Sequence, residues 1–140
     1  MRIIIINGPN LNLLGKRAPE TYGTRSFDTF FSELKKKFPK HTIDYYQSNI
    51  EGEIIDCLHR SDQTHDAVIL NPGAYAHTSV AISDAVEAIG IPVVEVHISN
   101  IYTRDMYRQD LIIASQCKGV IIGFGLKGYE LAVSVLLNDS

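Results

Sequence analysis

Amide and imidazole side chains follow three apolar runs of the chain, each at or just beyond the last residue of the run. They are Asn7 and Asn10 after the first run, Asn71 and His77 after another, and His97 and Asn100 after a third, where the hydroxyl of Ser99 lies between them in sequence. Three arginines, Arg17, Arg104 and Arg108, occur in the polar segments that follow. Amides, imidazoles and guanidinium groups together suit a polar, anionic small molecule, provided that the fold brings them to one place. Taken singly, an Asn at a strand end is usually a turn residue.

The elements that must position these side chains follow from the hydrophobic pattern. Continuous β-branched runs are typical of strands buried on both faces, and apolar residues at helical spacing indicate helices. The expected strands span residues 2–7, 41–47, 67–71, 91–97 and 119–124. The expected helices lie between Ser26 and Pro39, over 50–61, near 79–89 and over 129–137. In the third helix we expect Val80, Ala81, Ala85, Val86 and Ile89 to face inward.

Strands that alternate with helices indicate a parallel sheet with helices on both faces. Five such units in 140 residues predict a single flavodoxin-like, doubly wound α/β domain over residues 1–140, with strand order 2-1-3-4-5. Ligands of this fold bind beyond the carboxyl ends of the strands, where the strand order reverses. Because the polar side chains follow those ends, we expect them to converge there.

Composition excludes several classes of protein. The chain is 45% hydrophobic and 21% charged, and its net charge is −3 with scattered cations, which argues against a nucleic-acid footprint. No apolar stretch is long enough for a signal sequence or a membrane span. Cys57 and Cys117 have neither metal-site nor redox-motif spacing, so we expect two reduced thiols in a cytoplasmic protein.

Other ligand-binding motifs fit the sequence poorly. The stretch GFGLKG at 123–128 matches a dinucleotide fingerprint, but it opens the last helix instead of the first, so its glycines are expected to serve a turn and helix–sheet packing. The first loop lacks the GK[ST] that a phosphate-binding loop needs. A phosphoacceptor domain would need an acidic pair after the first strand and an Asp at the end of the third, where this chain has Asn7 and Asn71. Glu95 and His97 point to the same face of their strand. Either the carboxylate fixes the tautomer of the imidazole, or the two residues form a hydrogen-bonded pair in the core. Too few further ligands are suitably spaced to indicate a metal site.

Four motifs together cover nearly the whole chain. They are NGPNLNLLGKRAPETYG at 7–23, ILNPGAYAHTSVAISDA at 69–85, EVHISNIYTRDMYR at 95–108 and GFGLKGYELA at 123–132. In this order and spacing the chain closely resembles the type II dehydroquinases (3-dehydroquinate dehydratases). The resemblance implies a dehydration of 3-dehydroquinate to 3-dehydroshikimate in the shikimate pathway, without metal or cofactor.

The resemblance also implies roles for individual residues, in an anti elimination that passes through an enolate. Tyr22 matches the base and His77 the acid, Asn10 the residue that holds a water at the enolate oxygen, and Arg17 the arginine of a lid formed by the first loop. Substrate ligands are implied at Asn71, His97, Ile98, Ser99 and Arg108. Asp84 matches a carboxylate that reaches the site of a neighbouring subunit, in a homododecamer built as a tetramer of trimers.

Simple chemistry supports these implied roles. A free tyrosine titrates near about pH 10, and a nearby cation such as Arg17 favours its phenolate. Amide donors can stabilise an enolate without a metal. Two alternatives stay open: a non-catalytic module that binds a flavin or a small anion, and a Schiff-base dehydratase, which would need a buried lysine. The segment QDLIIAS at 109–115 departs from the family pattern at Asp110 and Leu111, which puts local packing or subunit contacts in doubt.

Overall fold

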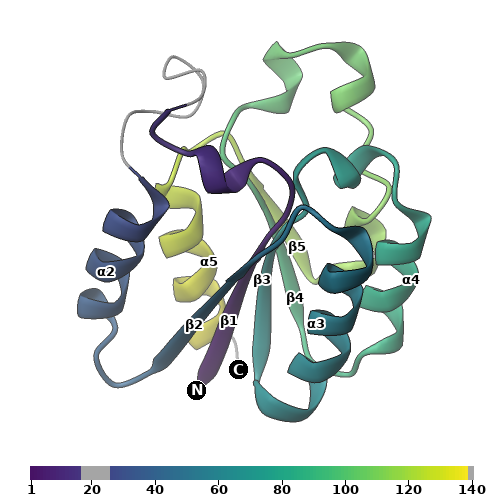
Figure 1. The fold of residues 1–140 in the computed structure, drawn as a ribbon. Helices are drawn as coiled ribbons and strands as arrows, with labels where there is room; N and C mark the ends of the chain where they lie inside the picture. Colours follow the sequence, from purple (N-terminus) through teal and green to yellow (C-terminus); the bar gives the residue numbers. More distant parts are fainter. Residues whose placement is uncertain (17–25, 139–140) are drawn as a thin grey trace.

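A five-stranded parallel sheet forms the centre of the molecule in a computed structural model that describes residues 1–16 and 26–138 (Figure 1). Its strands are β1 (Arg2–Asn7), β2 (Thr42–Gln47), β3 (Ala67–Asn71), β4 (Val93–His97) and β5 (Gly119–Ile122). Their order is β2-β1-β3-β4-β5, as predicted, and all four neighbouring pairs are parallel. The strand order reverses at β1, so the switch point lies between β1 and β3.

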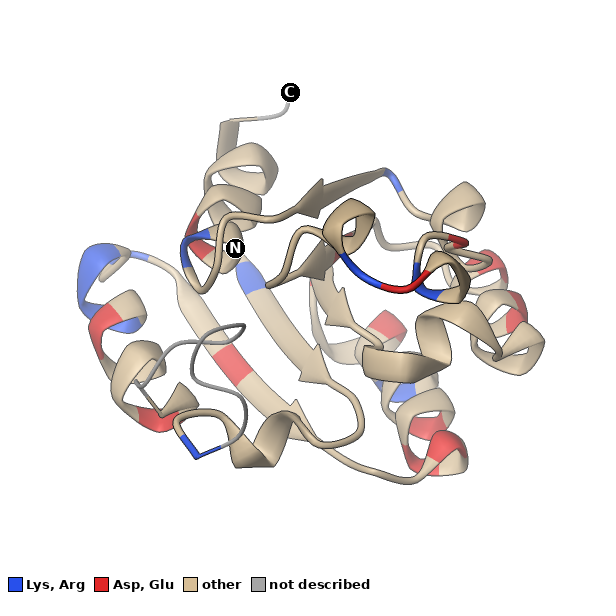
Figure 2. Cartoon of the chain, turned by 90° about the horizontal axis from the view of Figure 1, so that it is seen from above, with Lys and Arg blue, Asp and Glu red and all other residues tan. Residues whose placement is uncertain are grey.

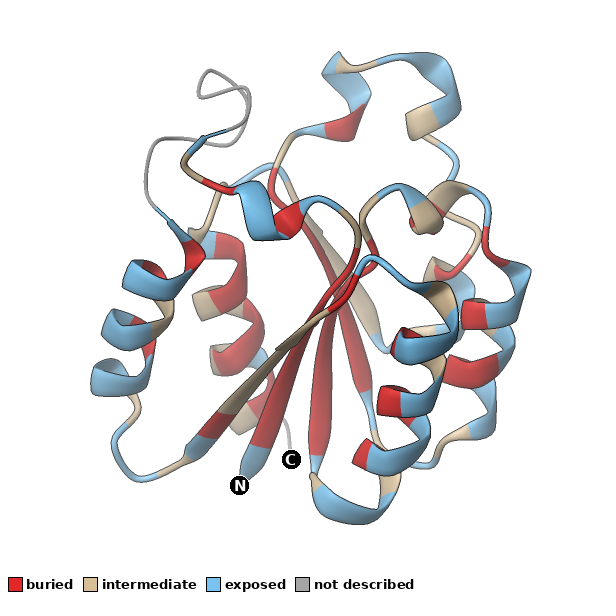
Figure 3. Ribbon diagram, viewed as in Figure 1, coloured by how far each residue is buried: buried red, intermediate tan, exposed pale blue. Residues whose placement is uncertain are grey.

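Helices cover both faces of the sheet. On one face lie α2 (Phe27–Lys37) and α5 (Lys127–Asn138), and on the other lie α3 (Glu51–Thr64) and α4 (Val80–Ala88) (Figure 1). Successive side chains of β1 alternate between the two faces of the sheet and so contribute to both cores. Ile3 and Ile5 belong to the core beneath α2 and α5, whereas Ile4 and Ile6 belong to the core beneath α3 and α4. The strands are therefore buried on both faces, and the helices expose only their outer sides (Figure 3).

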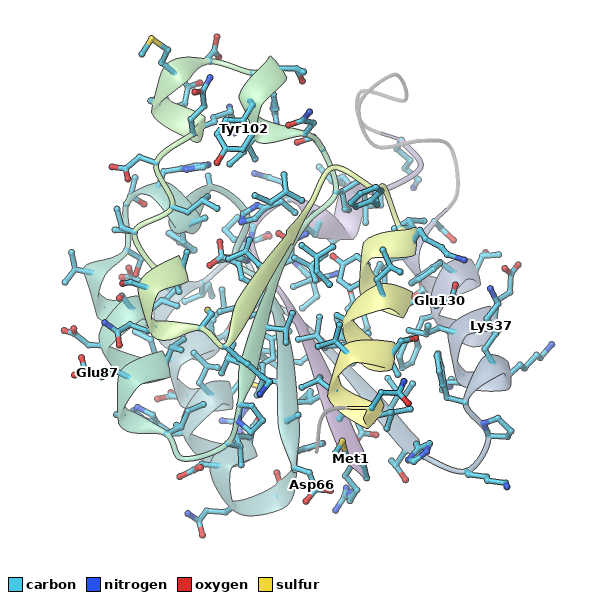
Figure 4. All side chains as sticks on the ribbon, turned by 180° about the vertical axis from the view of Figure 1, so that it is seen from behind. Met1, Lys37, Asp66, Glu87, Tyr102 and Glu130 are labelled. Carbon is cyan, nitrogen blue, oxygen red and sulfur yellow. The ribbon has the colours of Figure 1, made fainter. Side chains whose placement is uncertain are left out.

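Helix α2 begins and ends where its sequence predicts. The Ser26 hydroxyl accepts a hydrogen bond from the Thr29 backbone N–H, which caps the first turn. Three lysines occupy the last turn, where they complement the helix dipole. One of them, Lys37, reaches across to Glu130 of α5 at 3.0 Å, so the two helices of this layer are also joined at their surface (Figure 4).

The predicted inward face of α4 is partly wrong. Val80 and Ala81 are exposed, and the buried residues are Ile82, Ala85 and Val86. The cause is the cap: the Ser79 hydroxyl accepts from the Ile82 N–H, which starts the helix at Val80 and turns its first two residues to solvent.

The predicted polar loops contain short 3₁₀ helices at the carboxyl ends of the strands. These are η1 (Leu11–Leu13) after β1, η2 (Gly73–His77) after β3, and η3 (Ile101–Thr103) and η4 (Met106–Arg108) after β4 (Figure 1). A further turn, η5 (Ala114–Gln116), leads into β5. Seen from this end, acidic and basic residues are scattered over the described helices and loops (Figure 2).

Several predicted boundaries shift by a few residues. Strand β4 begins at Val93 instead of residue 91, and β5 ends at Ile122, so that Phe124 lies beyond the sheet and is largely exposed. Ile50, predicted to lie within the second helix, is the residue before α3 and is exposed. The glycines of GFGLKG serve packing as expected, since a Cβ on Gly128 would come within 3.2 Å of Val96 Cγ1.

Candidate active site

The loops after β1 and β3 interlock at the switch point. A Cβ atom on Gly8 would lie 2.4 Å from the carbonyl oxygen of Pro72, and one on Gly73 would lie 3.0 Å from that of Pro9. The Gly8 N–H also donates to the Asn71 carbonyl at 2.8 Å. Gly73 has φ +60, a conformation that residues with a side chain rarely adopt. These contacts hold the two loops against each other and leave a pocket beside them.

The pocket brings together most of the predicted site residues. Polar side chains from the ends of β1, β3 and β4 line it, together with the two arginines of the segment after β4. Its lining includes Asn10, Asn71, His77, His97, Ile98, Ser99, Arg104 and Arg108. The convergence expected at the carboxyl edge is therefore observed among the described residues.

Asn10 is held by the local backbone. Its φ of 68 lies in the left-handed region, which asparagine tolerates better than other residues with a side chain. Its N–H donates to Asn49 Oδ1 at 3.0 Å, and its carbonyl accepts from the N–H of Leu13, the last residue of η1. These two contacts fix the backbone at a residue whose side chain borders the pocket.

His97 lies beside a buried carboxylate. Its Nε2 is 2.5 Å from Oε2 of Glu95, and Glu95 has no exposed surface. The other oxygen, Oε1, faces the Cys117 thiol at 3.7 Å. Burial and the adjacent Glu95 charge raise the pKa of the Cys117 thiol to about 12, so it remains a hydrogen-bond donor at neutral pH. The two oxygens of Glu95 therefore face His97 Nε2 and the Cys117 thiol. Nδ1 of His97 makes no contact with this carboxylate.

His77 has a weaker partner. Its Nδ1 lies 3.0 Å from the backbone carbonyl of Asp110 and donates to it in the corresponding tautomer. The Ile112 N–H also donates to the Ala76 carbonyl at 3.0 Å, so the segment 110–112 is joined to η2 twice. Asp110 contributes through its backbone here, which means that its departure from the family pattern does not remove this contact.

Two arginines and one serine supply hydrogen-bond donors to the pocket. Arg104 and Arg108 are half-buried, and Arg104 Nη1 lies 3.4 Å from the Ser99 hydroxyl. Arg108 also packs over the ring of Tyr107, with its guanidinium carbon 5.2 Å from the ring centre. Arg104 was predicted to lie over this edge of the sheet without a role of its own, and its position in the pocket lining adds it to the site.

Several predicted residues lie elsewhere. Asn7 and Asn100 follow strands but do not line the pocket, because Asn7 is fully buried and the Asn100 side chain caps η3 by accepting from the Tyr102 N–H. Asp84 is exposed on α4 and also does not line it. Arg17 and Tyr22 lie outside the described residues.

Two other features are not found in residues 1–16 and 26–138, the part of the chain that the structure describes. No group of three or more His, Cys, Asp or Glu side chains is placed to hold a metal ion in that part of the chain. No helix within it has the length and apolar character needed to cross a membrane. The seven lysines of the sequence are all exposed and none lines the pocket, which weighs against the Schiff-base alternative.

The fold and the site define a doubly wound α/β protein with a polar, cationic pocket at its switch point. The family model for dehydroquinase class II matches residues 1–137. The chain is 50% identical over 138 residues to a 3-dehydroquinate dehydratase of Exiguobacterium sp., covering 98% of this chain and 94% of the relative. It is 48% identical over 139 residues to a 3-dehydroquinate dehydratase of Clostridium botulinum, covering 98% and 95%.

A solved structure agrees with these relatives. The crystal structure of type II dehydroquinase from Butyrivibrio crossotus superposes with a TM-score of 0.95 at 39% identity, covering 99% of this chain and 98% of that one. The chain therefore belongs to the class II dehydroquinase family.

Proposed function

We propose that this pocket binds 3-dehydroquinate and removes water from it, giving 3-dehydroshikimate by anti elimination through an enolate. Family membership makes the enzyme a hydro-lyase of the shikimate pathway. The observation that carries the proposal is the convergence of Asn10, Asn71, His77, His97 and Arg108 in one pocket. The substrate is a polyhydroxylated carboxylate, and these donors match its charge and hydroxyl groups.

The base in this proposal is Tyr22, which removes the proton next to the ketone. Its assignment, and that of Arg17 as the cation that favours its phenolate, depends on the motif alone because both residues lie outside the described part of the chain. Asn10 supports the next step, since its side chain borders the pocket and an amide can position a water against the enolate oxygen. Such preorganised donors act without a metal.

In this proposal the acid is one of the two histidines that line the pocket, His77 and His97. The resemblance assigns His77, whose Nδ1 is oriented by the Asp110 carbonyl. The contacts favour His97, because Glu95 fixes a proton on Nε2 and balances the charge of an imidazolium that donates from Nδ1 to the departing hydroxyl. In this version of the mechanism His77 becomes a substrate ligand. The two assignments predict opposite effects on kcat for substitutions of His77 and His97.

Substrate binding falls to the remaining pocket residues. We assign the carboxylate to Ser99, the backbone at Ile98 and the Asn71 amide, and the ring hydroxyl groups to Arg108 and one histidine. Arg104 adds a guanidinium close to Ser99, which suits an anionic group at this end of the pocket.

We also infer a homododecamer arranged as a tetramer of trimers, in which Asp84 reaches the site of a neighbouring subunit. The exposed position of Asp84 on α4, away from its own pocket, supports this inference. Light scattering measures the mass: twelve copies of the 15.6 kDa chain are expected, and a monomeric mass would contradict the arrangement.

Enone formation tests the proposed function. Purified protein is mixed with 3-dehydroquinate, and the conjugated product is followed by its ultraviolet absorbance. We expect turnover by the natural sequence and its loss in Tyr22→Phe. Tyr102→Phe, at an exposed tyrosine that does not line the pocket, is the matched control and should keep full activity. Undiminished turnover in Tyr22→Phe would remove Tyr22 as the base.

A further inference from the structure

A buried chain of hydrogen bonds connects α5 to the pocket. The Tyr129 side chain has no exposed surface, and its hydroxyl lies between two asparagines at the ends of adjacent strands. The hydroxyl oxygen is 2.9 Å from Asn71 Nδ2 and 2.8 Å from Asn7 Oδ1. Asn7 Nδ2 in turn lies 3.5 Å from the Tyr45 hydroxyl. Of the two asparagines, Asn71 borders the pocket.

Strand geometry explains why this chain forms. Asn7 and Asn71 are paired neighbours in the register of β1 and β3. Both have the same orientation as Ile5 and Ile69, which pack into the core beneath α5. Two amides therefore point side by side into the α5 layer, where Tyr129 is the polar group that meets both.

The direction of every bond in the chain is set by a backbone group. The Gly73 N–H can only donate, and it lies 3.2 Å from Asn71 Oδ1, so the oxygen of that amide must face Gly73. The Asn71 NH₂ group then faces Tyr129, whose oxygen accepts. Tyr129 must in consequence direct its own hydrogen to Asn7 Oδ1. A flip of the Asn71 amide would place its oxygen against Tyr129 and its NH₂ group against the Gly73 N–H, donor against donor.

We propose that Tyr129 is a positioning residue for the reaction, which holds the Asn71 amide in the orientation that the Gly73 N–H sets, so that one Nδ2 hydrogen is presented to the substrate. Only one of the two Nδ2 hydrogens is used by Tyr129, and the other remains for a ligand. This proposal rests on the proposed function, because it takes the pocket as the place where 3-dehydroquinate binds. Tyr129 touches no substrate in this account and acts through Asn71.

The burial of Tyr129 suits this role. Removal from solvent raises the pKa of its hydroxyl above the usual range for tyrosine. The group therefore stays protonated over the working pH range, and it keeps one hydrogen to donate and one lone pair to accept. The ring is held as well, since it meets the ring of Phe27 edge-on at 5.1 Å and lies close to Phe30.

Tyr129→Phe removes the hydroxyl and keeps the ring. The Asn71 amide then loses the acceptor that holds it, so we expect KM for 3-dehydroquinate to rise by roughly three- to tenfold while kcat stays within about twofold. Tyr45→Phe is the matched control: it removes a tyrosine hydroxyl at the far end of the same chain and leaves the Tyr129–Asn71 bond in place. Its KM should equal that of the natural sequence.

Asn7→Leu provides a second route if Tyr129→Phe does not fold. It deprives the Tyr129 hydrogen of its acceptor without touching Asn71, and it should raise KM in the same direction. An unchanged KM in the Tyr129→Phe variant, with only a lower melting temperature, would show a purely structural role and overturn the proposal.

A readout independent of turnover separates this proposal from the proposed function. The Asn71 side-chain NH₂ resonances, assigned by NMR, should show slow hydrogen exchange in the natural sequence and Tyr45→Phe, and fast exchange in Tyr129→Phe. Equal exchange in all three proteins would overturn the positioning role. Absence of turnover by the natural sequence would instead overturn the assigned substrate, and the exchange data would still decide how Asn71 is held.

Discussion

Nε2 of His97 and Oε2 of Glu95 lie 2.5 Å apart at the carboxyl end of β4, and the carboxylate is wholly buried. The two residues are separated by one position, so the alternation of the strand puts both side chains on the face that packs against the layer of α3 and α4. The sequence left two interpretations of this pair open, a tautomer-fixing carboxylate or a paired core couple. Because His97 also borders the pocket, the first interpretation accounts for more of the geometry.

Replacement of Glu95 by Gln tests the function of the pair. The amide keeps the shape but not the charge, so an imidazolium at His97 is no longer balanced, and we expect kcat to fall by about tenfold or more. Glu87→Gln, at an exposed position of α4, is the matched control and should keep kcat (Figure 4). Steady-state rates over a range of pH measure the effect. A kcat that equals the control at every pH would assign the pair to the core alone.

A pair of equivalent substitutions distinguishes the roles of His77 and His97. If His97 is the acid, His97→Asn lowers kcat by about 10²–10⁴-fold, whereas His77→Asn mainly raises KM, since His77 then serves as a substrate ligand. The same measurements made on both variants, at one pH and with the fold checked by circular dichroism, decide between them. The reverse pattern would return the acid to His77, as the resemblance implies.

The sheet could be predicted from the sequence because the composition of each strand, rich in β-branched and other apolar residues, indicates a strand. Runs such as the four isoleucines of β1 have no helical period, and their alternation with amphipathic helices fixes a parallel order. The turns after the strands carry no such signal. The 3₁₀ segment Gly73–His77 depends on local hydrogen bonds and on the contact of Gly73 with Pro9, which no periodicity reveals.

The site was predictable in position and less so in detail. Asn7 and Asn71 both end a strand and look equivalent in sequence, yet of the two only Asn71 borders the pocket. Both amides contact the Tyr129 hydroxyl, but the Asn7 amide also faces the Tyr45 hydroxyl, whereas Asn71 Oδ1 faces Gly73 of the pocket lining. Arg104 and Arg108 also look alike in sequence, because both lie in the polar segment after β4. The short helices η3 and η4 decide where each side chain points, and a polar segment without a hydrophobic period does not predict them.

Gly8 should be intolerant of a side chain. In Gly8→Ala the new Cβ would meet the Pro72 carbonyl at 2.4 Å, so the loops after β1 and β3 must separate, and both the melting temperature and turnover should fall. Gly52→Ala is the control. Its Cβ meets nothing within 4 Å, and Ala is favoured over Gly inside α3 by about 0.5–1 kcal/mol, so this variant should be slightly more stable and equally active. Equal melting temperatures for the two variants would contradict the interlocked arrangement.

The Cys117 thiol should make the protein less stable in alkaline solution. Its pKa is raised to about 12 in the folded state, chiefly by burial and then by the Glu95 charge, from an ordinary value of 9.0. Between these values the unfolded thiol loses its proton and the folded one keeps it. The unfolded state therefore binds fewer protons, and the free energy of unfolding falls as pH rises through this window.

Cys117→Ser removes this titration and keeps a donor for Glu95. Urea unfolding at about pH 7.5 and about pH 10 measures the free energy of unfolding of both proteins. Below the ordinary thiol pKa neither state of the natural protein carries a thiolate, so the difference between the two proteins is constant there. Above it we expect the natural protein to lose more stability than Cys117→Ser. Parallel losses in the two proteins would mean that the folded thiol ionises as readily as the unfolded one, and that Glu95 and burial do not hold its proton.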